Sequence, residues 1–397
     1  MSFNFDLPFR AWEQRELSSL LSFSNGINAP KEHYGKGRKM ISVMDILDEK
    51  PVKYEFIRNS VQVDKKIESK NKVEYGDIVF VRSSEVPEEV GWAKAYLEKE
   101  YALYSGFSIR GKKINEFNPY FVELTLNSIN RKQIERKAGG STRFNVSQTI
   151  LSSIEVLMPE IEEQNKIDKF FIQLDTTIAL HQRKLDALKL MKKGFLQQMF
   201  PKIEADIPEI RFADFDGKWE QRKLGEIFNE RSERSADGEL ISVTINSGVI
   251  KASKLEKKDN SSFDKSNYKV VKKGDIAYNS MRMWQGASGY SSYDGILSPA
   301  YTVIYPRKDI DTIFIAYMFK KIDMIQTFQR NSQGLTSDTW NLKFPSLSTI
   351  KIKIPANDEQ IKITNLFQKL EYTSILHQNQ IEMLKKVKKA YLQTMFI

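Results

Sequence analysis

Residues 158–200 read MPEIEEQNKIDKFFIQLDTTIALHQRKLDALKLMKKGFLQQMF, and residues 354–396 read IPANDEQIKITNLFQKLEYTSILHQNQIEMLKKVKKAYLQTMF. The two stretches align without a gap and are identical at 19 of 43 positions. An internal repeat of this length predicts that the chain contains two copies of one structural unit. Each copy also opens alike, because Trp-Glu-Gln-Arg occurs at 12–15 and again at 219–222.

Further landmarks come in the same order in both halves. Gly-Asp-Ile occurs at 76–78 and 274–276, and Gly-x-Thr follows at 140–142 and 334–336. The segments between the landmarks, roughly residues 21–138 and 229–332, show no convincing similarity. The sequence therefore predicts a shared frame, made of the landmarks and the repeated stretch, and two dissimilar segments between the landmarks. We call these two segments the fillings.

The repeated stretch is predicted to be a long helix. In each stretch, the predicted helix begins just after a proline, Pro159 or Pro355, carries acidic residues in its first turns and ends rich in lysine, as the helix dipole favours. About 40 residues at 1.5 Å each give a rod of about 60 Å. Apolar residues recur at alternating spacings of four and three, which indicates a heptad seam. The seam positions are Phe171, Leu174, His181, Leu185, Leu188, Phe367, Leu370, His377, Ile381 and Leu384. Neither rod has enough core to stand alone, so we expect the two helices to pack as an antiparallel pair.

His181 and His377 occupy equivalent seam positions near the midpoints of the two predicted helices. We interpret them as a polar pair that fixes helix register; solvent-exposed histidines are the alternative. A metal bridge is not expected, because no further ligands are evident nearby. On the register hypothesis, leucine at both positions raises stability and loosens the alignment of the domains.

Composition favours a polyanionic partner. The 397-residue chain has 61 Lys and Arg against 51 Asp and Glu, a formal net charge of +10, which points to nucleic acid first and an anionic membrane face second. The absence of cysteine excludes disulfides, thiol nucleophiles and thiolate zinc sites. No apolar run approaches the roughly 18 residues of a spanning helix, and the first residues do not resemble a signal peptide. We expect a soluble cytoplasmic protein without a membrane partner.

Basic, amide and hydroxyl side chains cluster around the short strands and turns predicted in each filling, at 73–81, 270–279, 296–306 and 348–355. Such side chains contact phosphates and base edges, although a solvated surface role is the alternative for each of them. Helices are predicted over 118–129 and 313–325. The DNA-binding candidates are Lys36, Arg38, Lys39, Arg82, Arg110, Lys112, Lys113, Arg136, Lys137, Ser141, Thr142 and Arg143 in the first half, and Asn279, Ser280, Arg282, Trp284, Gln285, Arg330, Gln333, Thr336 and Ser337 in the second.

Catalytic motifs are not convincing in this sequence. Residues 106–113 match the spacing of a phosphate-binding loop, but Lys113 stands where a Mg²⁺-binding hydroxyl is required. Asn-Pro-Tyr at 118–120 resembles the Asn-Pro-Pro-aromatic motif of amino-methyltransferases, yet the second proline is missing. We therefore assign no catalytic residue and no metal ligand.

Together, these motifs resemble the specificity subunit of type I restriction-modification systems. The duplicated frame, the opening Trp12 and Trp219, and the Glu-Gln pairs at 163–164 and 359–360 carry the resemblance. It implies two α/β (α+β) target-recognition domains in tandem, joined and spaced by two long antiparallel helices. The expected limits are 1–158 and 205–354 for the domains, and 159–204 and 355–397 for the helices. The first half lacks the Met-Arg-Met-Trp-Gln-Gly-Ala and Ser-Pro-Ala-Tyr elements of the second, so it is expected to recognise a different sequence.

The resemblance also implies a function and partners. Each domain would recognise one half of an asymmetric bipartite site in double-stranded DNA, and the helices would set the spacer between the halves. Two modification subunits would methylate adenine N6, and restriction subunits would add ATP-dependent cleavage. S-adenosylmethionine, ATP and Mg²⁺ are expected on those partners, with no cofactor in this chain. The alternatives are a DNA-modifying enzyme with an unrecognised active site and a basic helical scaffold protein.

Overall fold

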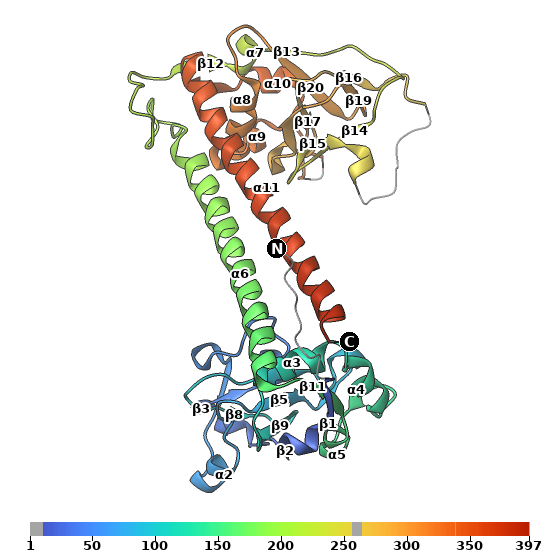
Figure 1. The fold of residues 1–397 in the computed structure, drawn as a ribbon. Helices are drawn as coiled ribbons and strands as arrows, with labels where there is room; N and C mark the ends of the chain where they lie inside the picture. Colours follow the sequence, from blue (N-terminus) through green and yellow to red (C-terminus); the bar gives the residue numbers. More distant parts are fainter. Residues whose placement is uncertain (1–10, 256–263, 338, 397) are drawn as a thin grey trace, which may run out of the picture. The chain divides into compact units, whose positions relative to one another are not determined.

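The computed structural model describes residues 11–255, 264–337 and 339–396, and it contains two compact units (Figure 1). One unit is Met1–His181 with Gln380–Ile397, and the other is Gln182–Asn379. The long helices α6 (Ile161–Gln198) and α11 (Asn357–Thr394) each contribute a segment to either unit. The limits expected for the recognition domains, 1–158 and 205–354, each fall inside one unit and stay a prediction. Among the described residues, no helix is both long and apolar enough to cross a membrane.

The first unit combines short strands with short helices. Its strands are β1 (Glu13–Glu16), β2 (Leu21–Asn25), β3 (Tyr34–Ile41), β4 (Asn59–Val61), β5 (Ile78–Val81), β6 (Ser83–Ser84), β7 (Ala93–Ala95), β8 (Leu103–Tyr104), β9 (Ser108–Lys113), β10 (Phe144–Asn145) and β11 (Glu155–Met158). Its helices, apart from segments of α6 and α11, are α1 (Val43–Ile46), α2 (Lys65–Lys70), α3 (Pro119–Asn127), α4 (Arg131–Lys137) and α5 (Gln148–Ser152), with 3-10 turns η1 (Leu17–Ser19), η2 (Lys31–His33), η3 (Tyr54–Phe56) and η4 (Pro87–Glu89).

The second unit has the same mixed content. Its strands are β12 (Glu220–Lys223), β13 (Phe228–Glu230), β14 (Ile241–Thr244), β15 (Gly248–Lys251), β16 (Lys269–Val271), β17 (Ile276–Asn279), β18 (Ser288–Tyr290), β19 (Gly295–Leu297), β20 (Tyr301–Pro306) and β21 (Lys351–Ile354). Its shorter helices are α7 (Leu224–Ile227), α8 (Thr312–Met318), α9 (Ile322–Asn331) and α10 (Phe344–Ser348), with 3-10 turns η5 (Ala252–Lys254) and η6 (Met283–Gln285). The predicted fold class, two mixed domains in tandem with long helices, is confirmed.

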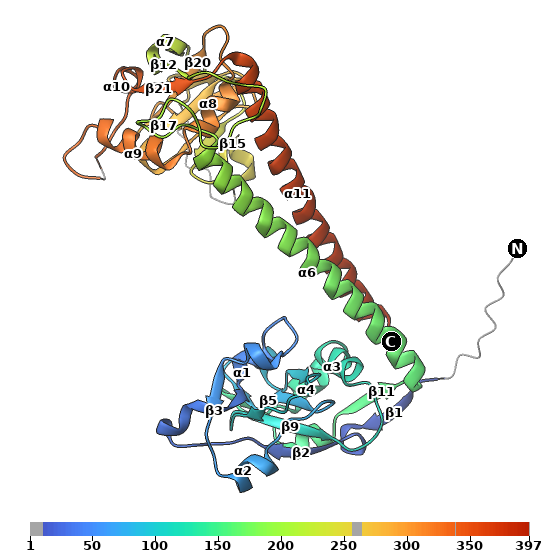
Figure 2. The same ribbon diagram turned by 90° about the vertical axis from the view of Figure 1, so that its left-hand side faces the viewer.

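Each unit contains a four-stranded antiparallel sheet with the same strand order. The orders are β2-β9-β5-β7 and β13-β20-β17-β18, and β5 and β17 both carry the isoleucine of a Gly-Asp-Ile landmark. In Figure 2, β2, β9 and β5 lie side by side in the first unit. The two fillings thus share a sheet without recognisable sequence similarity, because backbone groups make the ladder and many apolar sequences satisfy it.

The Gly-Asp-Ile landmark is explained by the turn that leads into the central strand of each sheet. Gly76 and Gly274 have φ of 95° and 94°, in the region that favours glycine. The next residues, Asp77 and Asp275, are buried, and each accepts a hydrogen bond from the backbone N–H three residues earlier, at 3.0 and 2.8 Å. Burial raises the pKa of Asp77. This turn needs both residue types, which is why it recurs in both halves.

Both faces of each central sheet are covered. Along β5, Ile78 and Phe80 pack into a core shared with α3 and α6, whereas Val79 and Val81 pack into a second core with β3, α1 and β8. Alternation of side chains along a strand places these pairs on opposite faces. β17 behaves in the same way, with its second core formed by β14, β15, β16 and β19. The layer on the second face is therefore what differs between the units.

The last turn of the chain closes the core of the first unit. Phe396 is fully buried, and its ring lies 6.1 Å from Trp12, 5.5 Å from Phe121 and 6.2 Å from Phe171. Trp12 and Phe121 also meet edge to face, at 5.8 Å. The repeated Trp and the repeated helix end thus form one aromatic cluster, although they lie at opposite ends of the sequence.

An equivalent cluster lies in the second unit. Phe200, just after α6, packs 6.2 Å from Trp219, 5.2 Å from Phe314 and 6.2 Å from Phe367. In each unit, the repeated phenylalanine therefore comes from the end of a long helix. Phe396 is far from the first domain in the sequence, whereas Phe200 lies only a few residues before the second domain. A recognition domain is completed by a segment that it does not carry itself.

Two ion pairs join segments of the long helices. Lys388 lies 2.6 Å from Asp175 in the first unit, and Lys192 lies 2.6 Å from Glu371 in the second. Asp175 and Glu371 are equivalent in the repeat, as are Lys192 and Lys388. Together with the ring contacts Phe171–Phe396 and Phe200–Phe367, these ion pairs show that the segment of α6 runs antiparallel to the segment of α11 within each unit, as expected.

A tyrosine from the short helix of each domain reinforces these ion pairs. Tyr120 donates a hydrogen bond to Asp175 at 2.7 Å, and Tyr317 lies next to Glu371. Burial, together with the neighbouring carboxylate, raises the pKa of both phenols. Asn-Pro-Tyr at 118–120 is accordingly part of the packing of α3 on α6. The phosphate-loop spacing at 106–113 falls on strand β9 and its approach.

The Glu-Gln pairs have a structural role at the start of each long helix. Gln164 and Gln360 each donate to the carbonyl of the proline five residues earlier, at 2.8 and 2.9 Å. Their side-chain oxygens accept the backbone N–H of Asn118 and Asp311, at 2.9 and 3.0 Å. Both donor residues are the N-caps of the helices that pack on the long helices, α3 and α8, so the equivalent glutamine fixes the same junction in each unit.

The helix predicted over 313–325 is interrupted, and that prediction was wrong. The structure has two helices, α8 and α9, separated at Phe319–Lys321. Lys321 is buried and has extended backbone (φ −67°, ψ 143°), which lets its ammonium donate to the carbonyl of Pro201 at 2.6 Å and pair with Asp323. The predicted helix over 118–129 is observed as α3.

The seam positions divide into buried and half-buried residues. Phe171, Leu185, Phe367, Leu370 and Ile381 are buried. Leu174, His181, Leu188, His377 and Leu384 are half-buried. The role of the two histidines in register stays a prediction.

Candidate nucleic-acid interface

An exposed loop carrying the Gly-x-Thr landmark has the same construction in both units. We call residues 140–143 and 334–337 the first and second glycine loops. An isolated antiparallel bridge closes each loop at its base, Gly139 with Asn145 and Gln333 with Asn341. Each loop follows a short helix, α4 or α9, and precedes another, α5 or α10. The helix–loop–helix order is therefore common to both domains.

Each glycine loop docks against the segment that follows the central strand. Just after the loops, the backbone N–H of Val146 donates to the carbonyl of Arg82, and that of Leu342 donates to Ser280, at 3.0 and 2.8 Å. Arg82 follows β5, and Ser280 follows β17. The structure thus brings together candidates that lie about 60 residues apart in the first unit, where Arg143 also bonds Ser83 at 3.0 Å.

In the second unit this docking forms a patch of aromatic, amide and basic side chains. Trp284 and Trp340 meet edge to face at 5.1 Å, and Trp284 donates to the carbonyl of Met281 at 3.0 Å. Arg282 is exposed beside them, 3.5 Å from Gln285. The second patch contains Asn279, Arg282, Trp284, Gln285, Arg330, Gln333, Thr336 and Ser337. Ser280 is buried and bonded to Thr302, so it supports the patch from inside.

Lys320 holds the backbone next to this patch in place. Its ammonium donates to the carbonyls of Gly286, at 2.6 Å, and Ile245, at 3.2 Å. Burial, with a smaller contribution from the positive charge of Lys192, lowers the pKa of Lys320 to about 8. The carbonyl of Gly286, which ends the Met-Arg-Met-Trp-Gln-Gly segment, is thus held by a half-buried lysine.

The lowered pKa of Lys320 predicts how stability depends on pH. The unfolded chain binds the proton more tightly than the folded chain between about pH 8 and the ordinary lysine value, so this residue makes the free energy of unfolding rise with pH across that window. Relative to Lys320→Met, wild-type protein should gain about 2 kcal/mol between about pH 7.5 and pH 9.5 in urea unfolding. Parallel pH profiles for the two proteins would contradict this.

Several candidates of the first half are engaged inside the domain. Arg38 bonds Glu100 at 2.7 Å and lies over the ring of Tyr101. Arg110 is buried and donates to the carbonyl of Lys72. The other members of this group donate mainly to backbone carbonyls or pair with a carboxylate: Lys39 to Ile57, Lys112 to Glu74, Lys113 to Phe117 and Lys137 to Ser153. These residues are hydrogen-bonded within the domain. The remaining candidates near the first glycine loop, which we call the first patch, are the exposed Arg136, Ser141, Thr142 and Arg143 and the half-buried Arg82, which donates to the carbonyl of Gly106 at 3.4 Å.

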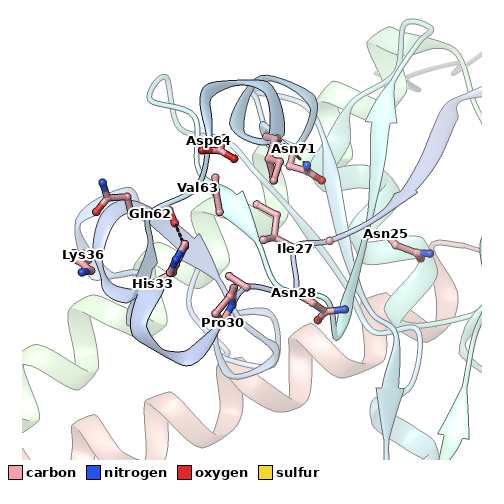
Figure 3. A pocket seen from close by; sticks show the side chains of 13 residues that line it. Asn25, Ile27, Asn28, Pro30, His33, Lys36, Gln62, Val63, Asp64 and Asn71 are labelled. Carbon is pink, nitrogen blue, oxygen red and sulfur yellow. Dashed lines mark hydrogen bonds between the residues drawn. The ribbon is translucent and has the colours of Figure 1, made fainter.

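Lys36 lies apart from the first patch, at an open hollow of about 810 Å³ (Figure 3). The hollow is lined by three segments of the second layer, 25–30, 33–36 and 62–71, and Ile27 and Val63 contribute apolar surface. Asn25, Asn28 and Gln62 also line it, and none of the three side chains is hydrogen-bonded to another residue in the described ranges. Free amides can each offer a donor and an acceptor to a base edge.

The amides of the hollow and the lysines of α2 were missed from the sequence. Lys65, Lys66 and Lys70 are exposed and form no ion pair with any described residue. The amides are spread over the chain and become neighbours only through β3 and β4, so no local motif could have found them. The charge of α2 was visible in the sequence, but its position beside the hollow was not.

The side chains at the site are groups that bind rather than groups that ligate a metal. In the part of the chain that the structure describes, no three His, Cys, Asp or Glu side chains are grouped so that they could hold a metal ion. Exposed arginines, hydroxyls, amides and indole rings are instead the groups that contact phosphates, sugars and bases.

Comparison with known families agrees with this arrangement. The sequence profile of the type I restriction modification DNA specificity domain matches residues 11–190 and again residues 216–386, which together make up most of the chain. The chain belongs to this family. It carries two copies of the specificity domain, and proteins of the family are the non-catalytic DNA-recognition components of type I restriction-modification systems.

Relatives with curated names are specificity subunits of Methanocaldococcus jannaschii. The type I restriction enzyme MjaVIII specificity subunit is 24% identical over 277 residues, 62% of this chain and 61% of that protein. A second protein, named for the MjaX specificity subunit, is 25% identical over 225 residues, 54% of this chain and 52% of that protein. The matches thus span only between half and two thirds of the length of these relatives.

Solved structures show the same fold over the whole chain. The S subunit of a type I restriction-modification system from M. genitalium has a TM-score of 0.58 at 16% identity, covering 100% of this chain and 98% of that one. The HsdS subunit from Thermoanaerobacter tengcongensis has a TM-score of 0.52 at 14% identity, covering 99% and 98%. The shared specificity-domain fold therefore extends through both units.

Proposed function

We propose that this chain is the DNA-recognition subunit of a type I restriction-modification complex, and that each unit recognises one half of a bipartite site in double-stranded DNA. One observation carries the proposal: two copies of a DNA specificity domain share a frame and a central sheet but differ in the second layer and in the patches around it. Unlike surfaces on a common frame recognise unlike sequences, so the target is asymmetric.

The long helices set the distance between the two half-sites and provide the docking surface for two modification subunits. Adenine N6 methylation then belongs to those subunits, and ATP-dependent cleavage belongs to restriction subunits that join them. S-adenosylmethionine, ATP and Mg²⁺ are bound by these partners. The complex acts in the cytoplasm. The repeated ion pairs between α6 and α11 support the role of the helices in spacing, because they join the two helices in the same way in each unit.

Mapping of methylated adenines tests the function. The chain is co-expressed with the modification subunits encoded beside it, and methylated adenines are located across the host genome. We expect one asymmetric bipartite sequence with a constant spacer, and no methylation when this chain is omitted. Methylation or cleavage of DNA by the purified chain alone would instead identify it as an enzyme, and equal binding to all DNA by the assembled complex would identify a scaffold.

Arg282 should contribute to recognition of one half-site only. Arg282→Ala removes an exposed guanidinium of the second patch and is expected to cost about 1 to 3 kcal/mol of binding if it contacts a base, with relaxed preference in the second half-site. Competition binding with duplexes altered in either half measures this. Lys308→Ala is the control. Asn279 of the second patch pairs with Tyr301 at the start of β20, whereas Lys308 is exposed just after the other end of that strand. An equal loss on every duplex would mark Arg282 as a phosphate contact.

A further inference from the structure

The two glycine loops are alike, although the surfaces beside them differ. Gly140 and Gly334 have φ of 125° and 141°. A side chain at Gly140 would meet the carbonyl oxygen of Arg143 at 2.0 Å, and one at Gly334 would meet that of Thr339 at 2.6 Å. Both loops therefore depend on glycine at the same place. The neighbouring segments do not match, since the Met-Arg-Met-Trp-Gln-Gly element occurs only in the second unit.

The loops present unused hydrogen-bond donors to solvent. Ser141 and Thr142 are exposed, and neither their backbone N–H groups nor their hydroxyls bond another residue of the described chain. In the second loop, Leu335 and Ser337 likewise keep free backbone N–H groups, judged over the same described ranges. The two free N–H groups of the first loop are consecutive, whereas those of the second loop are separated by Thr336, whose N–H donates to the Thr339 hydroxyl at 3.2 Å. Free backbone N–H groups close together beside a glycine suit an anionic oxygen.

Exposed cations stand next to each loop. Arg136, at the end of α4, and Arg143 flank the first loop, and Arg330, at the end of α9, precedes the second. Residues 136–147 contain no acidic side chain. The donors and the positive charge together favour phosphate over a neutral or basic partner surface.

We propose that the glycine loops are a pair of sequence-independent phosphate-binding loops, one for each half-site. The proposal rests on the proposed function of DNA recognition and deepens it. A device that is the same in both units cannot distinguish two different half-sites. What the half-sites have in common is the sugar–phosphate backbone, so the shared loops hold the backbone while the dissimilar surfaces beside them contact the bases.

The test uses the complex of the full chain with its modification subunits, and measures its affinity for the mapped target duplex and for an unrelated duplex over a range of salt concentrations. Gly140→Ala and Gly334→Ala should each weaken binding to both duplexes by the same factor, about tenfold, since a charge-assisted contact is lost. Arg143→Ala should also reduce the slope of log K against log salt by about 0.9. The methylated sequence should stay the same.

Matched variants separate the contact from the fold. Gly139→Ala is the control, because a side chain there would meet nothing within 4 Å, and its affinity should change less than about twofold. The Ser141→Ala/Thr142→Val double variant removes both hydroxyls without altering the loop backbone, so it and Arg143→Ala decide the question if Gly140→Ala does not fold, as judged by thermal unfolding.

Three results would overturn the proposal. An altered methylated half-site in a loop variant would show base recognition, loss of the modification subunits with unchanged DNA affinity would show protein docking, and unchanged affinity in both Arg143→Ala and the double variant would show no contact. If the wild-type complex itself fails to prefer its mapped target, the proposed function fails instead.

Discussion

Replacement of Phe396 by alanine is expected to destabilise the first unit by about 3 to 5 kcal/mol, although the residue is the second from the end of the chain. The ring is fully buried and contacts Trp12, Phe121 and Phe171, so its removal leaves a cavity in a core that α3, α6 and the opening strand share. Urea unfolding followed by tryptophan fluorescence measures the loss, because Trp12 borders the cavity.

Two further variants serve as comparisons for Phe396→Ala. Phe200→Ala should cost the second unit a similar amount, because Phe200 packs against Trp219, Phe314 and Phe367 in the equivalent cluster. Met383→Ala, on an exposed position of the same helix that leads to Phe396, should cost less than about 1 kcal/mol. A small effect of Phe396→Ala would mean that the first domain does not need the C-terminal segment.

Shortening both long helices by one heptad should change the spacer of the DNA target and leave the half-site sequences unchanged. Seven residues correspond to about 10 Å of helix, or up to about three base pairs of duplex at 3.4 Å each. Deletion of residues 177–183 and 380–386 keeps both ion pairs, Asp175–Lys388 and Lys192–Glu371, in the chain. Methylation mapping of the co-expressed complex gives the new spacer directly.

The control for the heptad deletion is the removal of the same segment from α6 alone. Loss of one heptad from a single helix leaves seven residues of the other helix without a partner. The protein should therefore lose stability rather than methylate a target with a shorter spacer. Altered half-sites with a constant spacer in the double deletion would refute the role of the helices in spacing. Leucine at both His181 and His377 tests register separately, because it leaves helix length unchanged.

The repeat allowed much of the frame to be predicted. The long helices and the Gly-Asp-Ile turns were visible because each depends on a few residue types in fixed order, such as a glycine with positive φ followed by a buried aspartate. The break between α8 and α9 was not visible, because it depends on Lys321 reaching a carbonyl more than 100 residues away.

The candidate site was predictable only in part. Arg110 and Lys113 carry the same charge as Arg136 and Arg143, but the first two donate to carbonyls inside the domain, whereas the others remain at the surface. Composition cannot make this distinction, since whether a cation faces a carbonyl or solvent depends on strands that are distant in sequence. For the same reason, the amides around the hollow could not be recognised as neighbours.

The sequence alone determined that the chain is a duplicated frame with two long helices, because helix periodicity and glycine turns are local properties that can be read residue by residue. The tertiary structure was needed to show that both fillings contain the same four-stranded sheet and that each glycine loop docks beside the end of the central strand. It also showed that Phe200 and Phe396 complete equivalent aromatic clusters, Phe396 from the far end of the sequence. These features depend on backbone pairing and on packing between remote segments, and many different sequences satisfy both.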